Sequence, residues 1–204
     1  MRHARAALPL GLGLLLASAS LAAAAAPPGP AVGAWATYRW TSSMRQDVPV
    51  LVTDPSGQIT LAQESTPPPP LFVTYAVVRA DARSYTLQIV TRKRPDDSPL
   101  AVTQVRIDRG SGKALRSVTQ RPNGVIETPE SGLRPFHQAT TQGTEEQVAV
   151  PSGRFTAVRA GYRGGTVWVS DQVPPLGLVK ATFPNGTLEL VRHGTSGAKD
   201  LLRS

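Results

Sequence analysis

The sequence of 204 residues contains no cysteine. The chain can therefore form no disulfide bond, and it offers no thiolate for nucleophilic chemistry or for a soft metal ion. Aromatic residues are scarce, at 5% of the chain, and charged residues make up 18%. Without covalent cross-links the fold must be held by an apolar core, which a chain of this length is able to bury.

Long apolar runs are absent beyond the start of the chain, so we expect no transmembrane span in the mature protein. The apolar run at 6–21 is interrupted by glycine and serine and is shorter than a span needs. Arg2 and Arg5 precede it, and five alanines follow it at 22–26. This order predicts a secretory signal peptide at 1–26. We therefore expect a periplasmic or secreted protein, which lacks the cysteine of a bacterial lipid anchor.

The rest of the chain predicts one domain. We expect a Pro/Gly-rich leader at 27–33, a single β domain at 34–195 and a flexible tail at 196–204. The formal net charge of +8 is of the kind that favours nucleic acid or an anionic surface. The basic residues are spread out, however, and the cluster at 92–94 is followed by aspartates at 96–97. That pattern is typical of a solvated hairpin end, so we expect no nucleic-acid partner.

Apolar and polar residues alternate along most of the mature chain, which is typical of strands with one buried face. The proline run Pro67–Pro70 cannot donate ladder hydrogen bonds, so we expect a stiff connector before a strand that starts at Leu71. The pattern predicts an all-β fold of about nine or ten strands, either a curved antiparallel sheet or a half-open β-barrel, with little helix. The clearest runs lie at 71–79, 85–89, 105–107, 115–120, 155–158 and 188–191.

Glycine-containing turns separate these runs. The segment 108–113 predicts a hairpin loop, and Pro-Asn-Gly at 122–124 and at 184–186 predicts two tight turns. In an Asn-Gly hairpin turn both central residues adopt positive φ, which we expect at both places.

No arrangement of residues indicates catalysis. His137 and His193 are the only histidines after the expected signal peptide, and they do not make up a zinc ligand set. Ser170, the aspartate after it and His193 are the residue types of a catalytic triad, but Ser170 is not in a Gly-x-Ser-x-Gly elbow. Glu145 and Glu146 are adjacent, so on a strand they point to opposite faces. We therefore predict no enzyme activity, no metal and no cofactor.

Three aromatic residues are candidates for an apolar binding surface. Tyr38 and Trp40 lie two residues apart, so they share one face of the first mature strand. Trp168 alternates with valines and is expected on the face opposite to them. Two interpretations remain open, because each ring either plugs an end of the core or lines an apolar groove. The strand at 71–79 is apolar on both faces, so a lid, a ligand or a partner must cover the second face.

The stretch 167–180, VWVSDQVPPLGLVK, ends one strand and begins another. Pro174 and Pro175 cannot donate ladder hydrogen bonds, so strand pairing must stop there. We expect Asp171 to accept from nearby backbone amides and Gly177 to let the chain bend back. The stretch is interpreted as a rigid corner that holds one of its leucines against the sheet.

The last part of the chain resembles a known family. The segments VAVPSGRFTAVRA (148–160), GGTVWVSDQVPPLGLVKA (164–181) and GTLELVRHG (186–194) carry the resemblance. They are similar to bacterial envelope proteins with a V-P-x-G-x-F strand pair and a W-x-S-x-x-V-P-P-x-G turn. Those proteins look like the superfamily of periplasmic lipoprotein carriers and receptors of the LolA and LolB type. The resemblance implies a half-open antiparallel β-barrel whose concave face takes acyl chains or another apolar ligand.

These features favour a non-enzymatic protein that binds an apolar ligand, a lipid or a lipoprotein acyl chain, in the periplasm. The alternative is a structural module, or a module that binds an envelope protein partner, with a closed core and no ligand. Asp171 and Gly177 are assigned a structural role in the corner. The candidate ligand-binding residues are Tyr38, Trp40, Trp168, Pro174, Pro175, Leu176 and Leu178.

Overall fold

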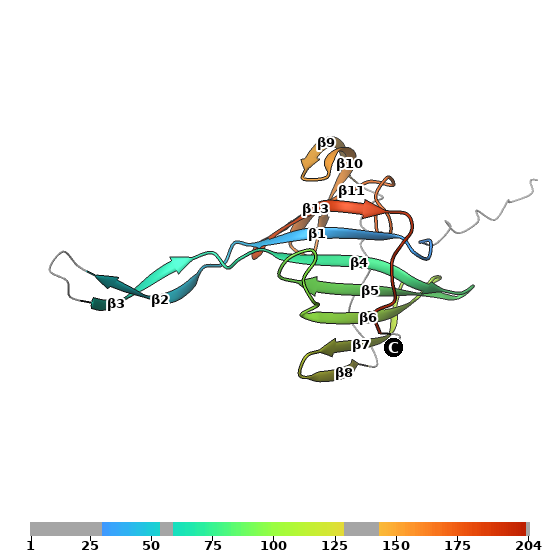
Figure 1. Ribbon diagram of the computed structural model, residues 1–204. Helices are drawn as coiled ribbons and strands as arrows, with labels where there is room; N and C mark the ends of the chain where they lie inside the picture. The colour runs from blue at the N-terminus through green and yellow to red at the C-terminus, as the bar shows by residue number, and fades with distance from the viewer. Residues whose placement is uncertain (1–29, 54–58, 129–142, 203–204) are drawn as a thin grey trace, which may run out of the picture.

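The computed structural model describes residues 30–53, 59–128 and 143–202 (Figure 1). The expected signal peptide at 1–26 lies outside these ranges. No helix occurs within them, and so none that is long and apolar enough to cross a membrane. The described strands are β1 (Trp35–Ser42), β2 (Gln46–Thr53), β3 (Ile59–Thr66), β4 (Leu71–Ala80), β5 (Ser84–Arg92), β6 (Ala101–Asp108), β7 (Ala114–Arg121), β8 (Gly124–Thr128), β9 (Thr144–Val150), β10 (Gly153–Tyr162), β11 (Gly165–Val169), β12 (Leu178–Phe183) and β13 (Gly186–Gly194).

Eleven of these strands form one antiparallel sheet in the order β8–β7–β6–β5–β4–β1–β13–β12–β11–β10–β9. The edge strands β8 and β9 do not pair with each other, so the sheet is not closed into a barrel. The prediction of an all-β antiparallel fold is confirmed, but the described chain has thirteen strands rather than nine or ten. The alternation left three or four strands unpredicted, and for two of them the reason is local. β2 contains Pro49, which weakens a strand prediction, and β8 has only 5 residues.

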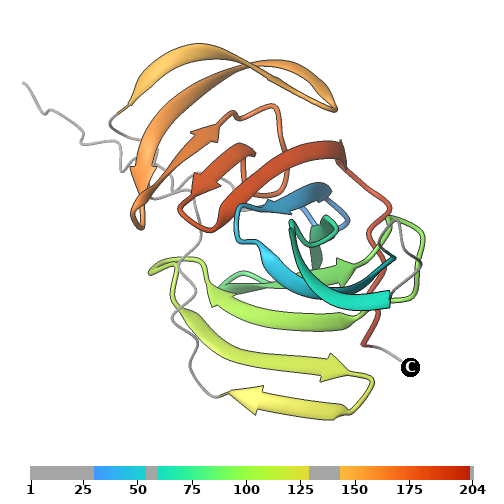
Figure 2. The ribbon, with the colours of Figure 1, turned by 90° about the vertical axis from the view of Figure 1, so that its left-hand side faces the viewer.

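The end of the sheet that carries β9 and β10 curls back toward β13 (Figure 2). The backbone N–H of Ser152, between β9 and β10, donates to the carbonyl oxygen of Leu190 in β13 at 3.2 Å. The ring of Phe155 in β10 lies 6.0 Å from that of His193 in β13, centroid to centroid. The curl gives this half of the sheet a concave side without bringing the two edge strands together.

The hairpin of β2 and β3 projects from the sheet as an arm (Figure 1). Among the described strands, these two pair only with each other. The arm continues the two-stranded ribbon that β1 and β4 begin, and Pro67–Pro70 lies at the junction between β3 and β4. The predicted connector before Leu71 is confirmed, and the physical reason is that four consecutive prolines cannot donate to a ladder.

The two Pro-Asn-Gly turns connect β7 to β8 and β12 to β13, as predicted, but with a different geometry. Arg121 pairs with Gly124 and Phe183 pairs with Gly186, so proline and asparagine are the central residues. Positive φ occurs at Gly124 (136°) and Gly186 (155°) and not at the asparagines. The expected Asn-Gly geometry is wrong because proline holds φ near −65° at the first central position.

The buried core consists of two clusters. The larger one joins β1 to β9–β13 and includes Tyr38, Leu178 and Leu190, all 0% exposed. The second lies among β4–β7 and includes Leu176, which arrives from the loop between β11 and β12. Tyr75 packs against both clusters. One loop residue and one strand residue therefore connect the two halves of the sheet.

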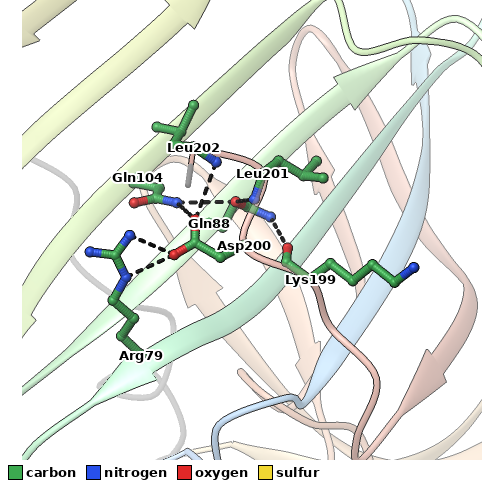
Figure 3. Close-up of polar contacts among 7 residues, drawn as sticks. All are labelled: Arg79, Gln88, Gln104, Lys199, Asp200, Leu201 and Leu202. Carbon is green, nitrogen blue, oxygen red and sulfur yellow. Dashed lines mark hydrogen bonds and ion pairs between the residues drawn. The ribbon is translucent and has the colours of Figure 1, made fainter. Parts of the chain in front are cut away.

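The C-terminal tail, residues 196–202, crosses the β4–β6 strands on the face that carries Gln88 (Figures 1 and 3). Gln88 is 2% exposed, and its Nε2 donates to the carbonyl oxygen of Lys199 at 2.9 Å. Its Oε1 accepts from the backbone N–H of Leu201 at 2.9 Å and from Nε2 of Gln104 at 3.1 Å. The buried side-chain amide of Gln88 therefore donates to one backbone group of the tail and accepts from another.

An ion pair adds to this contact. Nε of Arg79 donates to Oδ2 of Asp200 at 2.8 Å, and Nε2 of Gln104 donates to Oδ1 of Asp200 at 2.7 Å (Figure 3). The tail thus has one buried polar partner, Gln88, and two partly exposed ones, where the sequence suggested a flexible segment. It also covers part of the second face of the sheet, where Ala76 and Val90 are 3% and 2% exposed. Of the expected covers, a lid, a ligand or a partner, this part of the sheet has a lid made of the chain's own tail.

Candidate ligand-binding cavity beside the β11–β12 corner

The corner between β11 and β12, residues 170–177, is closed by its own backbone. The N–H of Ser170 donates to the carbonyl oxygen of Gly177 at 2.7 Å, and the N–H of Gly177 donates to the carbonyl oxygen of Val173 at 2.7 Å. Asp171 is exposed, and its carboxylate accepts no hydrogen bond from the residues that the structure describes. The backbone pairs therefore replace the role that the sequence suggested for Asp171.

Gly177 occupies a position that no other residue fits. Its φ is +72°, in the left-handed region. A Cβ atom at this position would lie 2.7 Å from Cγ1 of Val169 and 3.1 Å from the carbonyl oxygen of Ser170. Both the conformation and the lack of space require glycine here.

Two leucines anchor the corner on opposite sides. Leu176 is 2% exposed in the β4–β7 cluster, and Leu178 is 0% exposed in the larger cluster. The hydroxyl of Tyr38 donates to the carbonyl oxygen of Leu178 at 2.8 Å, which ties β1 to the start of β12. Burial, and to a smaller extent the neighbouring Tyr75, raises the pKa of Tyr38 well above its usual value. The hydroxyl therefore stays protonated and available as a donor.

A cavity of about 860 Å³ lies between this corner, the β9–β10 hairpin and the chain that leads into β1. Its volume falls within the roughly 300–1,000 Å³ that is usual for small-molecule sites. Alanine, valine, proline and leucine supply most of its walls. The lining residues are Pro30, Ala31, Ala34, Glu145, Thr156, Ala157, Val158, Thr195 and residues 169–177.

The polar residues of this lining are acidic or uncharged, and none is basic. Glu145 and Asp171 are its charged residues, and none of the described lining residues is lysine, arginine or histidine. Ser170 is only 6% exposed, and its hydroxyl makes no hydrogen bond within the part of the chain that the structure describes. A serine without a neighbouring general base is not activated as a nucleophile. The arrangement therefore suits binding rather than acyl transfer.

Two smaller cavities have the opposite charge. One of about 490 Å³ is lined by Arg79, Arg106 and Arg116, and one of about 330 Å³ by Arg92, Arg192 and Lys199. Each arginine of the 490 Å³ cavity already has a carboxylate partner. Arg79 pairs with Asp200, Arg106 with Asp81 and Arg116 with Glu127. The larger of these two cavities is therefore polar and largely neutralised, unlike the apolar cavity at the corner.

Trp168 does not line the cavity. Its ring lies between two cations, with Cζ of Arg159 at 6.0 Å and Nζ of Lys180 at 5.9 Å from the ring centroid. Its indole N–H donates to the carboxylate of Glu146. Val167, its neighbour in the strand, is 0% exposed on the opposite face, and Trp168 packs partly buried against the larger core cluster. Cation–π contacts and this hydrogen bond occupy the ring that the sequence suggested as a ligand contact.

The other sequence-predicted residues divide between the cavity and the core. Trp40 packs against Phe183, with ring centroids 6.5 Å apart, and is not part of the lining. The structure brings Pro174, Pro175 and Leu176 to the cavity, together with Asp171 and Gly177, whereas Tyr38 and Leu178 are buried in the core.

Sequence reasoning missed the part of the lining that comes from β9, β10 and the chain before β1. Glu145 and Val158 pair across β9 and β10 and both line the cavity. The alternation of Glu145 and Glu146 was the one local indication that these two side chains have different surroundings. Glu145 lines the cavity, whereas Glu146 accepts a hydrogen bond from Trp168. Nothing local indicated that this hairpin curls next to the corner.

Comparison of the chain with protein-family models, curated proteins and solved structures finds no match. The resemblance of residues 148–194 to the lipoprotein-carrier superfamily therefore stays a prediction.

Proposed function

We propose that the mature chain is an exported, non-enzymatic protein that binds an apolar ligand, a lipid or acyl chain, in the cavity beside the corner. The observation that carries this proposal is the cavity of about 860 Å³ with mostly apolar walls. The corner supports it, because Leu176 and Leu178 hold that wall in place from two core clusters. A preformed wall lowers the cost of ordering the site when the ligand binds.

Apolar burial supplies the expected affinity. A ten-carbon chain buried at about 0.8 kcal/mol per methylene gains about 8 kcal/mol. Association costs at least about 4 kcal/mol in lost translational and rotational freedom. The remaining 4 kcal/mol or so corresponds to a Kd on the order of 1 mM, and longer chains should bind more tightly.

The test combines co-purification with a matched pair of variants. Native mass spectrometry of the mature chain from an envelope extract should show bound lipid. The uncharged dye N-phenyl-1-naphthylamine should show a saturable rise in emission on binding. Thr156→Trp, an exposed position that lines the cavity, should weaken dye binding at least about fivefold. Gln120→Trp, an exposed position in β7 that is not part of the lining, is the control and should bind the dye as wild type does.

Three results would contradict the proposal. They are an apo mass with no bound lipid, dye emission that does not saturate, and equal dye affinity in the two tryptophan variants. Tryptophan fluorescence is a poor readout here, since none of the described lining residues is tryptophan.

A partner-binding module is the second candidate, and the free edge of the sheet favours it. Among the described strands β8 pairs only with β7, and its residues Val125 and Ile126 are 65% and 53% exposed. An edge strand with exposed apolar side chains can accept a strand from another protein. A pull-down that recovers one stoichiometric partner, lost in Val125→Lys but kept in Thr156→Trp, would favour this function over the first.

A further inference from the structure

We propose that the cavity selects amphiphiles with a positively charged, hydrogen-bond-donating head group, a primary ammonium, over amphiphiles with an anionic head. This inference rests on the proposed function and names the ligand class of the same cavity. It is carried by the charge of the lining and by a serine hydroxyl of the lining that has no partner within the described part of the chain.

The charge of the lining runs against the charge of the whole chain. The formal net charge is +8, and the two other cavities described above are lined by arginine and lysine. At the corner, Glu145 and Asp171 are the charged lining residues, and no described lining residue is basic. An anionic head group would meet two carboxylates there without a compensating cation. A cationic head group would meet two partners of opposite sign.

Ser170 is a second, independent indication of a ligand. Its side chain lines the cavity at 6% exposure, and its backbone N–H and carbonyl are used by Gly177 and Val173. Its hydroxyl has no hydrogen-bond partner within the described part of the chain. A hydroxyl oxygen without a protein partner can accept a hydrogen bond from an ammonium N–H in the cavity.

Isothermal titration with three probes of equal chain length tests the inference: decylammonium, decyl sulfate and the uncharged decyl maltoside. Only binding that Thr156→Trp weakens at least about fivefold is counted, which excludes binding of decyl sulfate to arginines elsewhere. We expect decylammonium to bind about tenfold more tightly than decyl sulfate at low salt, which is about 1.4 kcal/mol. The preference should shrink as salt is added.

Variants assign the preference to named groups. The double variant Glu145→Gln, Asp171→Asn should reduce the preference for decylammonium over decyl sulfate to about twofold or less. Asp97→Asn removes an exposed carboxylate that does not line the cavity, so it should keep the tenfold preference. Ser170→Ala should weaken decylammonium about threefold.

The outcomes separate this inference from the proposed function. If decyl sulfate binds the cavity as tightly as decylammonium, or if the double variant keeps the preference, the head-group inference is wrong and apolar binding stands. If none of the three probes gives binding that Thr156→Trp weakens, the proposed function is wrong and the inference is wrong with it.

Discussion

Replacing Asp200 with alanine should loosen the C-terminal tail and lower the stability of the whole sheet. The carboxylate of Asp200 accepts from Nε of Arg79 at 2.8 Å and from Nη2 of Arg79 at 2.5 Å. It also accepts from Gln104 at 2.7 Å. The side chain of Asp200 is 13% exposed, whereas that of Arg79 is 43% exposed. The contact is therefore buried on one side and solvated on the other.

The expected loss lies between that of a buried and that of a surface interaction. Removing one partner of a charged hydrogen bond costs about 1.5–3 kcal/mol, and a solvated ion pair contributes about 0.2–1 kcal/mol. Because the side chain of Arg79 is half exposed, we expect Asp200→Ala to lower the free energy of unfolding by about 2 kcal/mol. In a domain of this size, such a loss lowers the Tm by about 4–8 °C.

The pH dependence of the effect has a definite sign. Burial raises the pKa of Asp200, but hydrogen bonds from Arg79, Gln104 and the backbone of Leu202 outweigh it, so the pKa lies below its usual value. A carboxyl group whose pKa is lowered by folding stabilises the folded state above the pKa of the unfolded chain, about 3.9. That stability is lost as the pH falls through the folded-state pKa. The difference between wild type and Asp200→Asn should therefore be constant near neutral pH and shrink below about pH 4.

Thermal unfolding at pH 7 and at acidic pH measures both effects, and hydrogen exchange of the Leu201 amide reports on the tail directly. Asp97→Ala is the matched control, since it removes an exposed carboxylate from the turn between β5 and β6. Equal Tm values for Asp200→Ala and Asp97→Ala would refute the reasoning. Equally fast exchange at Leu201 in wild type and in Asp200→Ala would show that the tail does not dock.

Three further substitutions test the corner by chemical denaturation. Leu176→Ala should cost about 2–5 kcal/mol, because the side chain is 2% exposed, and a loss below 1 kcal/mol would exclude it from the core. Gly177→Ala should lower the free energy of unfolding by about 1–3 kcal/mol, because φ is +72° and the added Cβ would contact Val169. The control Gly161→Ala places its Cβ in open space and should leave the stability nearly unchanged. Equal stabilities of the two variants would contradict this account. Tyr38→Phe should cost about 1–2 kcal/mol by leaving the Leu178 carbonyl unpaired, and an unchanged midpoint would show that another donor replaces the hydroxyl.

The alternation of residue types was sufficient to predict strands and the faces of single residues. It predicted β4, β5, β6 and β13 and the proline connector before Leu71. It also predicted that Trp168 lies opposite its neighbouring valines and that Glu145 and Glu146 point apart, since side chains alternate along any strand. These properties depend only on the period of the backbone, so they can be read locally.

The order of strands in the sheet is not encoded in that period. β1 lies between β4 and β13, so Tyr38 meets Leu178, which is 140 positions away in the chain. Alternation indicates which face of a strand is apolar, but not which strand packs against it. The cavity was therefore only half predictable. Its corner wall is a continuous stretch of sequence, whereas its other wall comes from β9 and β10 through the curl of the sheet.

The C-terminal tail shows the same division. In the sequence, residues 196–204 form a short terminal segment that contains glycine and charged residues, a composition that predicts little burial. Its partner is Gln88, a polar residue in β5 that local alternation assigns to the outer face. Only the folded sheet places Gln88, Gln104 and Arg79 side by side under the tail, where they satisfy its backbone and Asp200. The sequence by itself determined the strands and their faces. Tertiary structure decided the cavity and the tail contact, because both depend on groups that meet only after distant strands have paired.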